Sequence, residues 1–251
     1  MTEPGKVYLV GSGPGDPDLL TVKAKRLLEE ADVVLHDKLP GPEILGAIPE
    51  EKREDVGKRA GGEWTPQEYT NARMVELAEE GKTVVRLKGG DPTVFGRGGE
   101  ELAHLAEHEI PVEVVPGITS AIAGPQAAGI PVTHRDHASS VSFVTGHEDP
   151  TKDESAVDWE ALAATGGTLV VLMGVGKLPQ YTDALREAGM DPETPVALVE
   201  RATRPDQRVA TGTLDTIVSV RDEEDVEPPA ITVIGDVAGE RERVVAFLEG
   251  Y

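Results

Sequence analysis

Residues 84–101 read Val-Val-Arg-Leu-Lys-Gly-Gly-Asp-Pro-Thr-Val-Phe-Gly-Arg-Gly-Gly-Glu-Glu and carry the clearest signal for the fold. A mostly apolar strand runs directly into two glycines, which lack a Cβ and let the backbone approach a ligand closely. Asp91 can accept hydrogen bonds from a ligand, and a second glycine-rich turn carries Arg97 and Glu100. A structural turn needs only one or two of these features. Their combination predicts a binding loop at the carboxyl end of a strand, where open α/β sheets place ligands.

Short apolar runs alternate with helical patterns around this stretch. The expected strands are residues 6–10, 33–35, 83–87 and 112–115, and the expected helices are residues 21–30, 65–80 and 99–107. Thr21 is the expected N-cap of the first helix, because its hydroxyl can accept a hydrogen bond from the first turn. This β–α alternation predicts a mainly parallel sheet with crossover helices.

The pattern changes after residues 116–121. The expected strands are then residues 140–145, 168–173, 196–199, 208–213 and 230–234, with helices at 159–164, 177–188 and 241–249. A hairpin beside residues 208–213 predicts a mixed sheet. The sequence therefore predicts an α/β protein of two domains, residues 1–115 and 121–251, joined by a linker at 116–120. Ligand sites favour domain interfaces, so we expect the active site in the interdomain cleft.

The composition excludes several classes of protein. The chain has 251 residues, of which 39% are hydrophobic and 4% aromatic, so its core must be mostly aliphatic. It contains no cysteine, which excludes disulfides, thiolate metal sites and a cysteine nucleophile. No run reaches the roughly 18 apolar residues that a membrane helix requires. The start of the chain has no signal-peptide pattern, so we expect a cytoplasmic protein.

The net charge is −22, from 46 acidic and 24 basic residues. A charge of this sign argues against nucleic acids and anionic membranes as partners, because both attract basic surfaces. It exceeds what solubility requires. We favour adaptation to high salt, where self-repulsion is screened, over an acidic protein from a low-salt source.

A glycine-rich turn at residues 11–16 follows the first strand. Its third glycine comes one position too early for the dinucleotide-binding fingerprint, and no phosphate-binding lysine follows as in a P-loop. Residues 11–21 instead resemble the opening motif of the tetrapyrrole methylases. Residues 89–101 resemble the second motif of that family, and residues 116–121 with 129–135 resemble the third. The resemblance covers essentially the whole chain in order.

Within that family, residues 56–61 and the Thr-His-Arg segment at 133–135 resemble the uroporphyrinogen-III C-methyltransferases most. The resemblance implies that S-adenosylmethionine methylates two pyrrole carbons of uroporphyrinogen III, giving precorrin-2 via precorrin-1. It also implies a homodimer. It does not say whether the product is used for sirohaem, cobalamin or a modified haem.

The resemblance also assigns site residues. Asp37 matches a proton acceptor and Lys58 a proton donor, whereas Arg97, Glu100 and Arg135 match substrate-binding positions. The methyl donor is expected to contact Pro14, Gly89, Gly90, Asp91, Val94, Thr119, Ser120, Met173 and Ala202. Considered alone, Asp37 reads as a carboxylate that ends a strand, Lys58 as part of a solvated basic pair, and Met173 as core filler.

The substrate that the resemblance implies carries eight carboxylates, so this acidic chain needs local positive charge to receive it. Lysine, arginine and histidine side chains in the loops could supply that charge, and arginine suits bidentate carboxylate contacts. The other cationic candidates are Lys58, Arg59, His134 and His137. A metal site from His134, Asp136 and His137 lacks the spacing of a known ligand set, and no metal is expected.

Two positions depart from the family pattern, because His36 and Ala127 stand where tyrosine is expected. Three alternatives remain open. The chain could methylate a later corrin intermediate, since the donor motifs are shared, or it could be the methylase that modifies a protein in the diphthamide pathway. It could also be a non-catalytic nucleotide-binding or regulatory protein.

Overall fold

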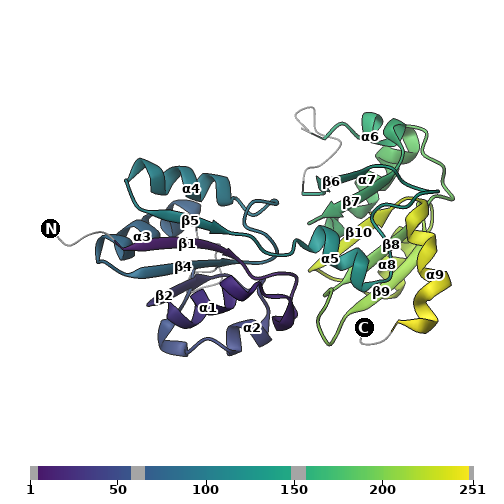
Figure 1. Ribbon diagram of the computed structural model, residues 1–251. Coiled ribbons are helices and arrows are strands. Elements are labelled where there is room, and N and C mark those ends of the chain that lie inside the picture. The colour runs from purple at the N-terminus through teal and green to yellow at the C-terminus, as the bar shows by residue number, and fades with distance from the viewer. Residues whose placement is uncertain (1–4, 58–65, 148–156, 249–251) are drawn as a thin grey trace. The chain divides into compact units, whose positions relative to one another are not determined.

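The first unit of the structure is built on a five-stranded parallel sheet (Figure 1). The structure is a computed structural model that describes residues 5–57, 66–147 and 157–248, and its two units are Met1–Thr119 and Ser120–Tyr251. The strand order in the first unit is β3-β2-β4-β1-β5. The strands are β1 (Lys6–Gly11), β2 (Val33–His36), β3 (Arg53–Asp55), β4 (Thr83–Lys88) and β5 (Val112–Val115).

Helices cover both faces of this sheet (Figure 1). They are α1 (Val22–Glu30), α2 (Pro42–Gly46), α3 (Gln67–Glu79) and α4 (Gly98–Glu107). On one face, Met74 and Leu105 pack with Leu9 of β1, and on the other, Leu27 and Ile44 pack with Leu87 of β4. Because all five strands are parallel, the loops that follow them leave from one edge of the sheet, where α/β proteins place ligands.

Thr21 caps α1, as the sequence predicted. Its Oγ1 atom accepts a hydrogen bond from the Ala24 amide at 3.1 Å. The cap satisfies one of the unpaired amides at the start of the helix and fixes where α1 begins. It thereby fixes the length of the glycine-rich connection that precedes α1.

The second unit contains the predicted mixed sheet, in the order β6-β7-β10-β8-β9. Its strands are β6 (Val141–Thr145), β7 (Thr168–Leu172), β8 (Pro195–Glu200), β9 (Arg208–Thr213) and β10 (Ala230–Ile234). The β6–β7 pair is parallel and the other pairs are antiparallel, including the predicted pairing of β9 with its neighbour β8. The α/β class with one parallel and one mixed sheet is therefore confirmed.

Five α-helices are described in the second unit. They are α5 (Ser120–Ala127), α6 (Trp159–Thr165), α7 (Leu178–Glu187), α8 (Ile217–Glu223) and α9 (Arg241–Val244). Trp159 stacks on Tyr181 within the core on one face of the sheet, at 5.5 Å between ring centroids. On the opposite face, Ala121 of α5 packs with Val170 and Ile231. Both faces of the mixed sheet are thus covered.

Several elements differ from the sequence-based expectation. The short elements β3 and α2, and helices α5 and α8, were not predicted. The predicted helix at 241–249 is instead α9, which ends at Val244, followed by a 3₁₀ turn at Val245–Phe247. Residue 249 lies outside the described residues. Among the described helices, none has both the length and the apolar character that crossing a bilayer demands.

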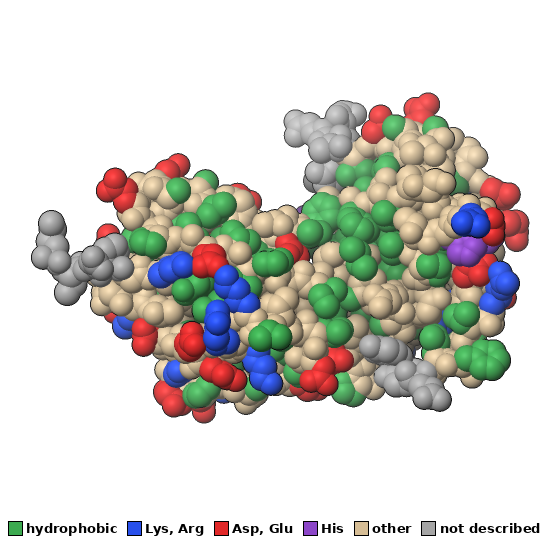
Figure 2. Space-filling view, in the orientation of Figure 1, with side chains coloured by type: hydrophobic (Ala, Val, Ile, Leu, Met, Phe, Trp, Pro, Cys, Tyr) green, Lys and Arg blue, Asp and Glu red, His purple; other side chains and the backbone are tan. Residues whose placement is uncertain are grey.

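Acidic side chains are spread over the surface of both units (Figure 2). Many of the described ones pair with a neighbouring arginine or lysine. Glu113, for example, contacts both Lys6 and Lys23, and these two cations hold the pKa of its carboxyl at about 2. Such pairs are exposed and contribute little to stability individually, so the excess negative charge is the dominant property of the surface.

Candidate functional site

Three glycine-rich loops meet at the carboxyl edge of the first sheet, where β4, β1 and β5 are neighbours. The loop after β1 and the loop after β4 form an isolated bridge. In it, the Gly13 amide donates to the Gly90 carbonyl at 3.1 Å, and the Gly90 amide donates to the Gly13 carbonyl at 2.8 Å. Two loops distant in sequence are therefore locked together by their backbones.

The contact among Gly11, Gly90 and Gly117 leaves no room for side chains, and we call it the glycine junction. A Cβ atom at Gly117 would lie 2.2 Å from the Gly90 carbonyl oxygen, and one at Gly11 would lie 2.5 Å from the same atom. Gly90 itself has a φ of 66°, in the left-handed region that favours glycine. The junction brings the backbones of three loops within contact distance and forms a cradle without side chains.

Asp91 ties this cradle together. Its Oδ1 atom accepts hydrogen bonds from the Thr93 amide at 2.8 Å and the Thr93 hydroxyl at 2.6 Å. Its Oδ2 atom accepts from the Gly117 amide at 3.1 Å. The sequence suggested a carboxylate that binds a ligand. In the structure this carboxylate also joins the loop after β4 to the loop after β5.

The structure brings together the donor-site residues that the sequence assigned to the first unit. Pro14 lies between Gly13 and Gly15, whose φ angles are 73° and 149°. The donor-site residues expected in the loops after β1 and β4 are Pro14, Gly89, Gly90, Asp91 and Val94. Thr119 is the last residue of this unit. A cradle of closely packed backbone with one carboxylate suits a ligand that carries amine and hydroxyl groups.

The remaining donor-site residues belong to the second unit. Ser120 begins α5, whereas Met173 and Ala202 follow β7 and β8. Met173 is 54% exposed, so it does not fill the core as an isolated methionine usually would. Its φ is 56°, and the residues on either side of Ala202 have φ angles of 47° and 67°. Strained backbone of this kind collects at ligand-binding segments.

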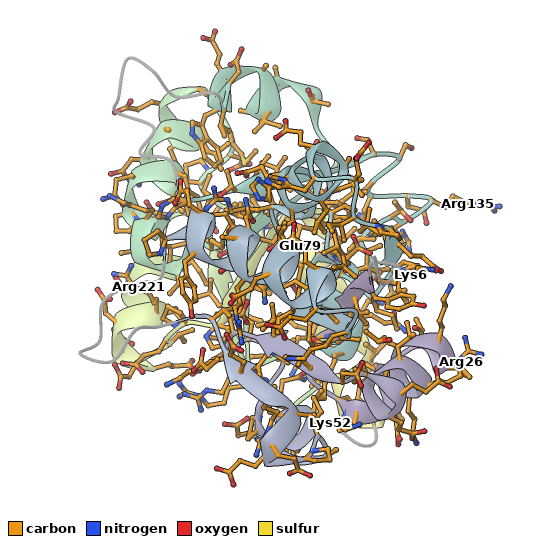
Figure 3. The ribbon with its side chains drawn as sticks, turned by 90° about the vertical axis from the view of Figure 1, so that its left-hand side faces the viewer. Lys6, Arg26, Lys52, Glu79, Arg135 and Arg221 are labelled. Carbon is orange, nitrogen blue, oxygen red and sulfur yellow. The ribbon has the colours of Figure 1, made fainter. Side chains whose placement is uncertain are left out.

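The expected substrate-binding residues differ in their surroundings. Arg97 donates two hydrogen bonds to Glu100, from Nε to Oε1 at 2.9 Å and from Nη2 to Oε2 at 2.7 Å. This contact raises the pKa of the Arg97 guanidinium and lowers the pKa of the Glu100 carboxyl. Arg135 is exposed and projects outward from its loop (Figure 3). A substrate carboxylate would thus compete with Glu100 for Arg97 but would meet Arg135 directly.

Asp37 lies directly after β2 at the carboxyl edge of the sheet. Its Oδ1 atom accepts a hydrogen bond from the Leu39 amide at 2.8 Å. Its Oδ2 atom is 3.5 Å from Nη2 of Arg86, and its side chain is 25% exposed. This carboxylate is therefore accessible to solvent and lies beside a buried cation. Lys58, the expected proton donor, lies outside the described residues.

Sequence reasoning missed the three charged residues behind Asp37. Arg86 and Lys88 lie on β4 and Glu101 lies on α4, and all three are buried. Together with Asp37 they form what we call the buried charge network. The signal in the sequence was a pair of cations two residues apart within an otherwise apolar strand, which places both on one face of the sheet.

The histidine cluster of the second unit contains hydrogen-bonded side chains. His137 Nε2 lies 2.9 Å from Glu240 Oε1, and His134 Nδ1 accepts from the Asp136 amide at 3.2 Å. Within residues 5–57, 66–147 and 157–248, no group of three or more His, Asp or Glu side chains is arranged to hold a metal ion.

Of the two departures from the family pattern, Ala127 is buried in α5, and His36 contacts the Asp37 carbonyl through Nδ1 at 2.9 Å.

Comparison with known proteins places these features in a family. Residues 6–218 match the family model of the tetrapyrrole (corrin/porphyrin) methylases. The chain is 59% identical over 234 residues to an S-adenosyl-L-methionine-dependent uroporphyrinogen III methyltransferase from Methanosarcina barkeri, covering 93% of this chain and 92% of that protein. It is 49% identical to a siroheme synthase from Hahella chejuensis over 97% of this chain but only 52% of the relative, so it spans about half of that protein.

A solved structure gives the same result. Uroporphyrin-III C-methyl transferase from Thermus thermophilus, complexed with S-adenyl homocysteine, aligns with a TM-score of 0.79 and 43% sequence identity. The alignment covers 94% of this chain and 99% of that one. The family model, the relatives and the fold agree, and the chain belongs to the tetrapyrrole (corrin/porphyrin) methylases.

Proposed function

We propose that the protein is an S-adenosylmethionine-dependent methyltransferase that methylates uroporphyrinogen III at two pyrrole carbons, giving precorrin-2 via precorrin-1. The observation that carries this proposal is the 59% identity to a uroporphyrinogen III methyltransferase across nearly the full length of both chains. The glycine junction supports it, because methyl transfer needs a donor held closely by backbone. S-adenosylmethionine supplies a methyl group on a positively charged sulfur.

In the proposal, different residues serve different steps of this reaction. The loops at the glycine junction, with Asp91, bind and orient the donor, so that the pyrrole carbon attacks in line with the bond that breaks. Such alignment accounts for up to several kcal/mol of the activation barrier. After methylation, the macrocycle loses a proton, and Asp37 accepts it. Thr119, Ser120, Met173 and Ala202 complete the donor-binding set in the proposal, and Lys58 keeps the role of proton donor that the family resemblance implies.

A product assay tests the proposed function. Purified protein is mixed with S-adenosylmethionine and uroporphyrinogen III, and the products are analysed by mass spectrometry. We expect a mass gain of two methyl groups and formation of S-adenosylhomocysteine. If uroporphyrinogen III is untouched while a methylated corrin intermediate accepts a further methyl group, the runner-up function is correct. The family likeness to a cobalt precorrin-4 methyltransferase, at 29% identity, makes that second substrate class the right comparison.

Arg97, Glu100 and Arg135 form the substrate-binding set in the proposal. Replacing Arg135 by alanine removes an exposed guanidinium that can bind a substrate carboxylate in bidentate fashion. We expect KM for the tetrapyrrole to rise about tenfold with little change in kcat, since a hydrogen bond to a charged group contributes about 1.5–3 kcal/mol when formed. Arg97→Ala should act in the same direction but less strongly, because Glu100 already occupies that guanidinium. Steady-state kinetics with each substrate varied provide the measurement.

Arg186→Ala is the matched control, because Arg186 is another exposed arginine, paired with Asp183 and Asp215. It should leave both KM values unchanged. An equal rise in KM for the methyl donor in the Arg135 and Arg97 variants would mean that these arginines support the whole protein rather than the substrate.

We further propose a cytoplasmic homodimer adapted to high salt. The support for salt adaptation is the net charge of −22 on 251 residues. The Debye length falls from about 30 Å at 0.01 M salt to about 3 Å at 1 M, so repulsion among surface carboxylates becomes short-ranged. We expect the melting temperature to rise steadily from dilute buffer to molar potassium chloride. Thermal unfolding across a potassium chloride series measures this, and a flat or falling curve would contradict salt adaptation.

A further inference from the structure

Three charged side chains are buried beneath the carboxyl edge of the first sheet. Glu101 is fully buried, Lys88 is 5% exposed and Arg86 is 6% exposed. Burying charges away from water is unfavourable, and a buried ion pair often stabilises a fold no better than apolar residues of the same size. Stability alone therefore gives no reason for charged residues at these positions, which lie directly behind Asp37.

Glu101 is the anchor of the buried charge network. Its Oε1 atom accepts hydrogen bonds from Arg86 Nε at 3.1 Å and from Gln67 Nε2 at 3.1 Å. Its Oε2 atom lies 2.8 Å from Lys88 Nζ, in an ion pair that lacks the direction of a hydrogen bond. Glu101 thus connects β4 with the first turns of α3 and α4, and its carboxylate is balanced by two cations.

Arg86 connects this anchor with Asp37. Its Nε atom donates to Glu101, its Nη1 atom donates to the Leu87 carbonyl at 3.0 Å, and its Nη2 atom lies 3.5 Å from Asp37 Oδ2. The guanidinium plane is therefore fixed on two sides before it meets Asp37. A planar, delocalised cation held in this way presents one edge to the carboxylate and cannot follow it if it moves.

The order of charges along the network is Asp37, Arg86, Glu101 and Lys88, so each charge borders one of opposite sign. Burial lowers the pKa of the Lys88 ammonium, and the neighbouring Arg86 lowers it further, whereas Glu101 and Asp37 oppose both effects. Lys88 and Arg86 together balance the buried carboxylate of Glu101. Changing any member changes the field at the next one.

Other charged groups also face Asp37 among the described residues. His36 and Lys38 are its neighbours in sequence, Lys88 on β4 interacts with its charge, and Asp55 at the end of β3 shares the space around Gly57 with it. Among the described residues, Arg86 is the cation that an ion-pair contact of 3.5 Å joins to the Asp37 carboxylate. The local field at Asp37 therefore depends first on Arg86.

We propose that Arg86 and Glu101 are positioning residues for Asp37: Glu101 fixes the guanidinium, and Arg86 holds the Asp37 carboxylate oriented at the edge of the sheet. This inference rests on the proposed function, in which Asp37 accepts a proton. It makes a prediction that a purely structural role does not make. Removing Arg86 or the charge of Glu101 should slow turnover only while Asp37 is present, because both residues act through it.

The first test is a double-mutant cycle with Asp37. In the wild-type background, Arg86→Gln and Glu101→Gln should each lower kcat by about tenfold, whereas in the Asp37→Asn background neither change should lower it further. Arg73→Gln is the matched control, because Arg73 forms an Arg–Glu pair with Glu54 in the same unit, and it should leave kcat unchanged in both backgrounds.

Rescue by the conservative variant provides the second readout. Arg86→Lys keeps a cation beside Asp37, so it should recover part of the kcat that Arg86→Gln loses, with the donor Kd unchanged in both variants. Losses of kcat that persist undiminished in the Asp37→Asn background would overturn the proposal. Should Glu101→Gln not fold, the two Arg86 variants decide instead, and equal kcat values in Arg86→Lys and Arg86→Gln would overturn the proposal.

The two levels of inference fail in different ways. If the wild-type protein transfers no methyl group to uroporphyrinogen III, the proposed function is wrong. If the wild-type protein is active but the effects of the Arg86 and Glu101 variants simply add to that of Asp37→Asn, the function stands and the positioning role is wrong.

Discussion

Replacing Asp37 by asparagine is expected to lower kcat by about 10²–10⁴-fold, the usual contribution of a positioned acid or base. Asparagine has the same shape and can still accept the hydrogen bond from the Leu39 amide, so the fold and the donor Kd should remain near wild type. What it cannot do is accept a proton from the methylated macrocycle. Single-turnover rates of methyl transfer, measured beside calorimetric titration of the donor, separate these effects.

Asp55→Asn is the control for this experiment. Asp55 ends β3 at the same edge of the sheet, and its carboxylate also accepts a backbone hydrogen bond, from the Gly57 amide at 2.8 Å. The control should keep nearly full activity. An Asp37→Asn protein that retains more than about a tenth of the wild-type rate would show that another group or water accepts the proton.

The second large effect is expected at the glycine junction. In Gly117→Ala the new Cβ atom would lie 2.2 Å from the Gly90 carbonyl oxygen and 2.7 Å from the Gly11 Cα atom, so the backbone must move. Overpacking of this kind costs typically about 1–3 kcal/mol, and here it also displaces the amide that binds Asp91. We expect a lower melting temperature and at least a tenfold weaker donor Kd, measured by thermal unfolding and calorimetric titration.

Gly46→Ala is the matched control, because an added Cβ at Gly46 meets nothing within 4 Å. It should leave donor binding intact and leave the protein at least as stable, since alanine favours the end of α2 over glycine. Wild-type donor affinity in Gly117→Ala would mean that the three loops are not part of the donor site.

Much of the fold could be predicted from sequence because several strands, such as β1, β4, β5 and β10, are apolar runs bounded by glycine or proline. The elements that escaped prediction lack that pattern. Strand β3 reads Arg-Glu-Asp, which resembles a surface loop, and it becomes a strand because it pairs with β2 at the edge of the sheet. Helix α5 contains Gly124 and Pro125, which usually end helices. Packing of its small residues against β7 and β10 overrides that local preference.

Some residues of the candidate site were also predictable from the sequence, whereas others were not. The glycine loops and Asp37 carry local signals, so their positions were predictable from short motifs. The pairing of Glu101 was not predictable from the sequence, because Glu101 lies on α4 and its partners Arg86 and Lys88 lie on β4. The sequence shows two cations in an apolar strand. Only the folded chain shows that one buried carboxylate neutralises both cations and that Arg86 also contacts Asp37.

The burial of Glu101 and its two cations also separates the chemistry from the ionic surroundings. Mobile ions crowd around the exposed carboxylates and weaken their mutual repulsion, but they cannot enter the packed space between β4 and α4, where interactions are screened much less. Stability can therefore vary with salt concentration while the interactions among Glu101, Arg86 and Lys88 change little. A protein built in this way tolerates changes in its external medium without disturbing the ion pairs that lie behind Asp37.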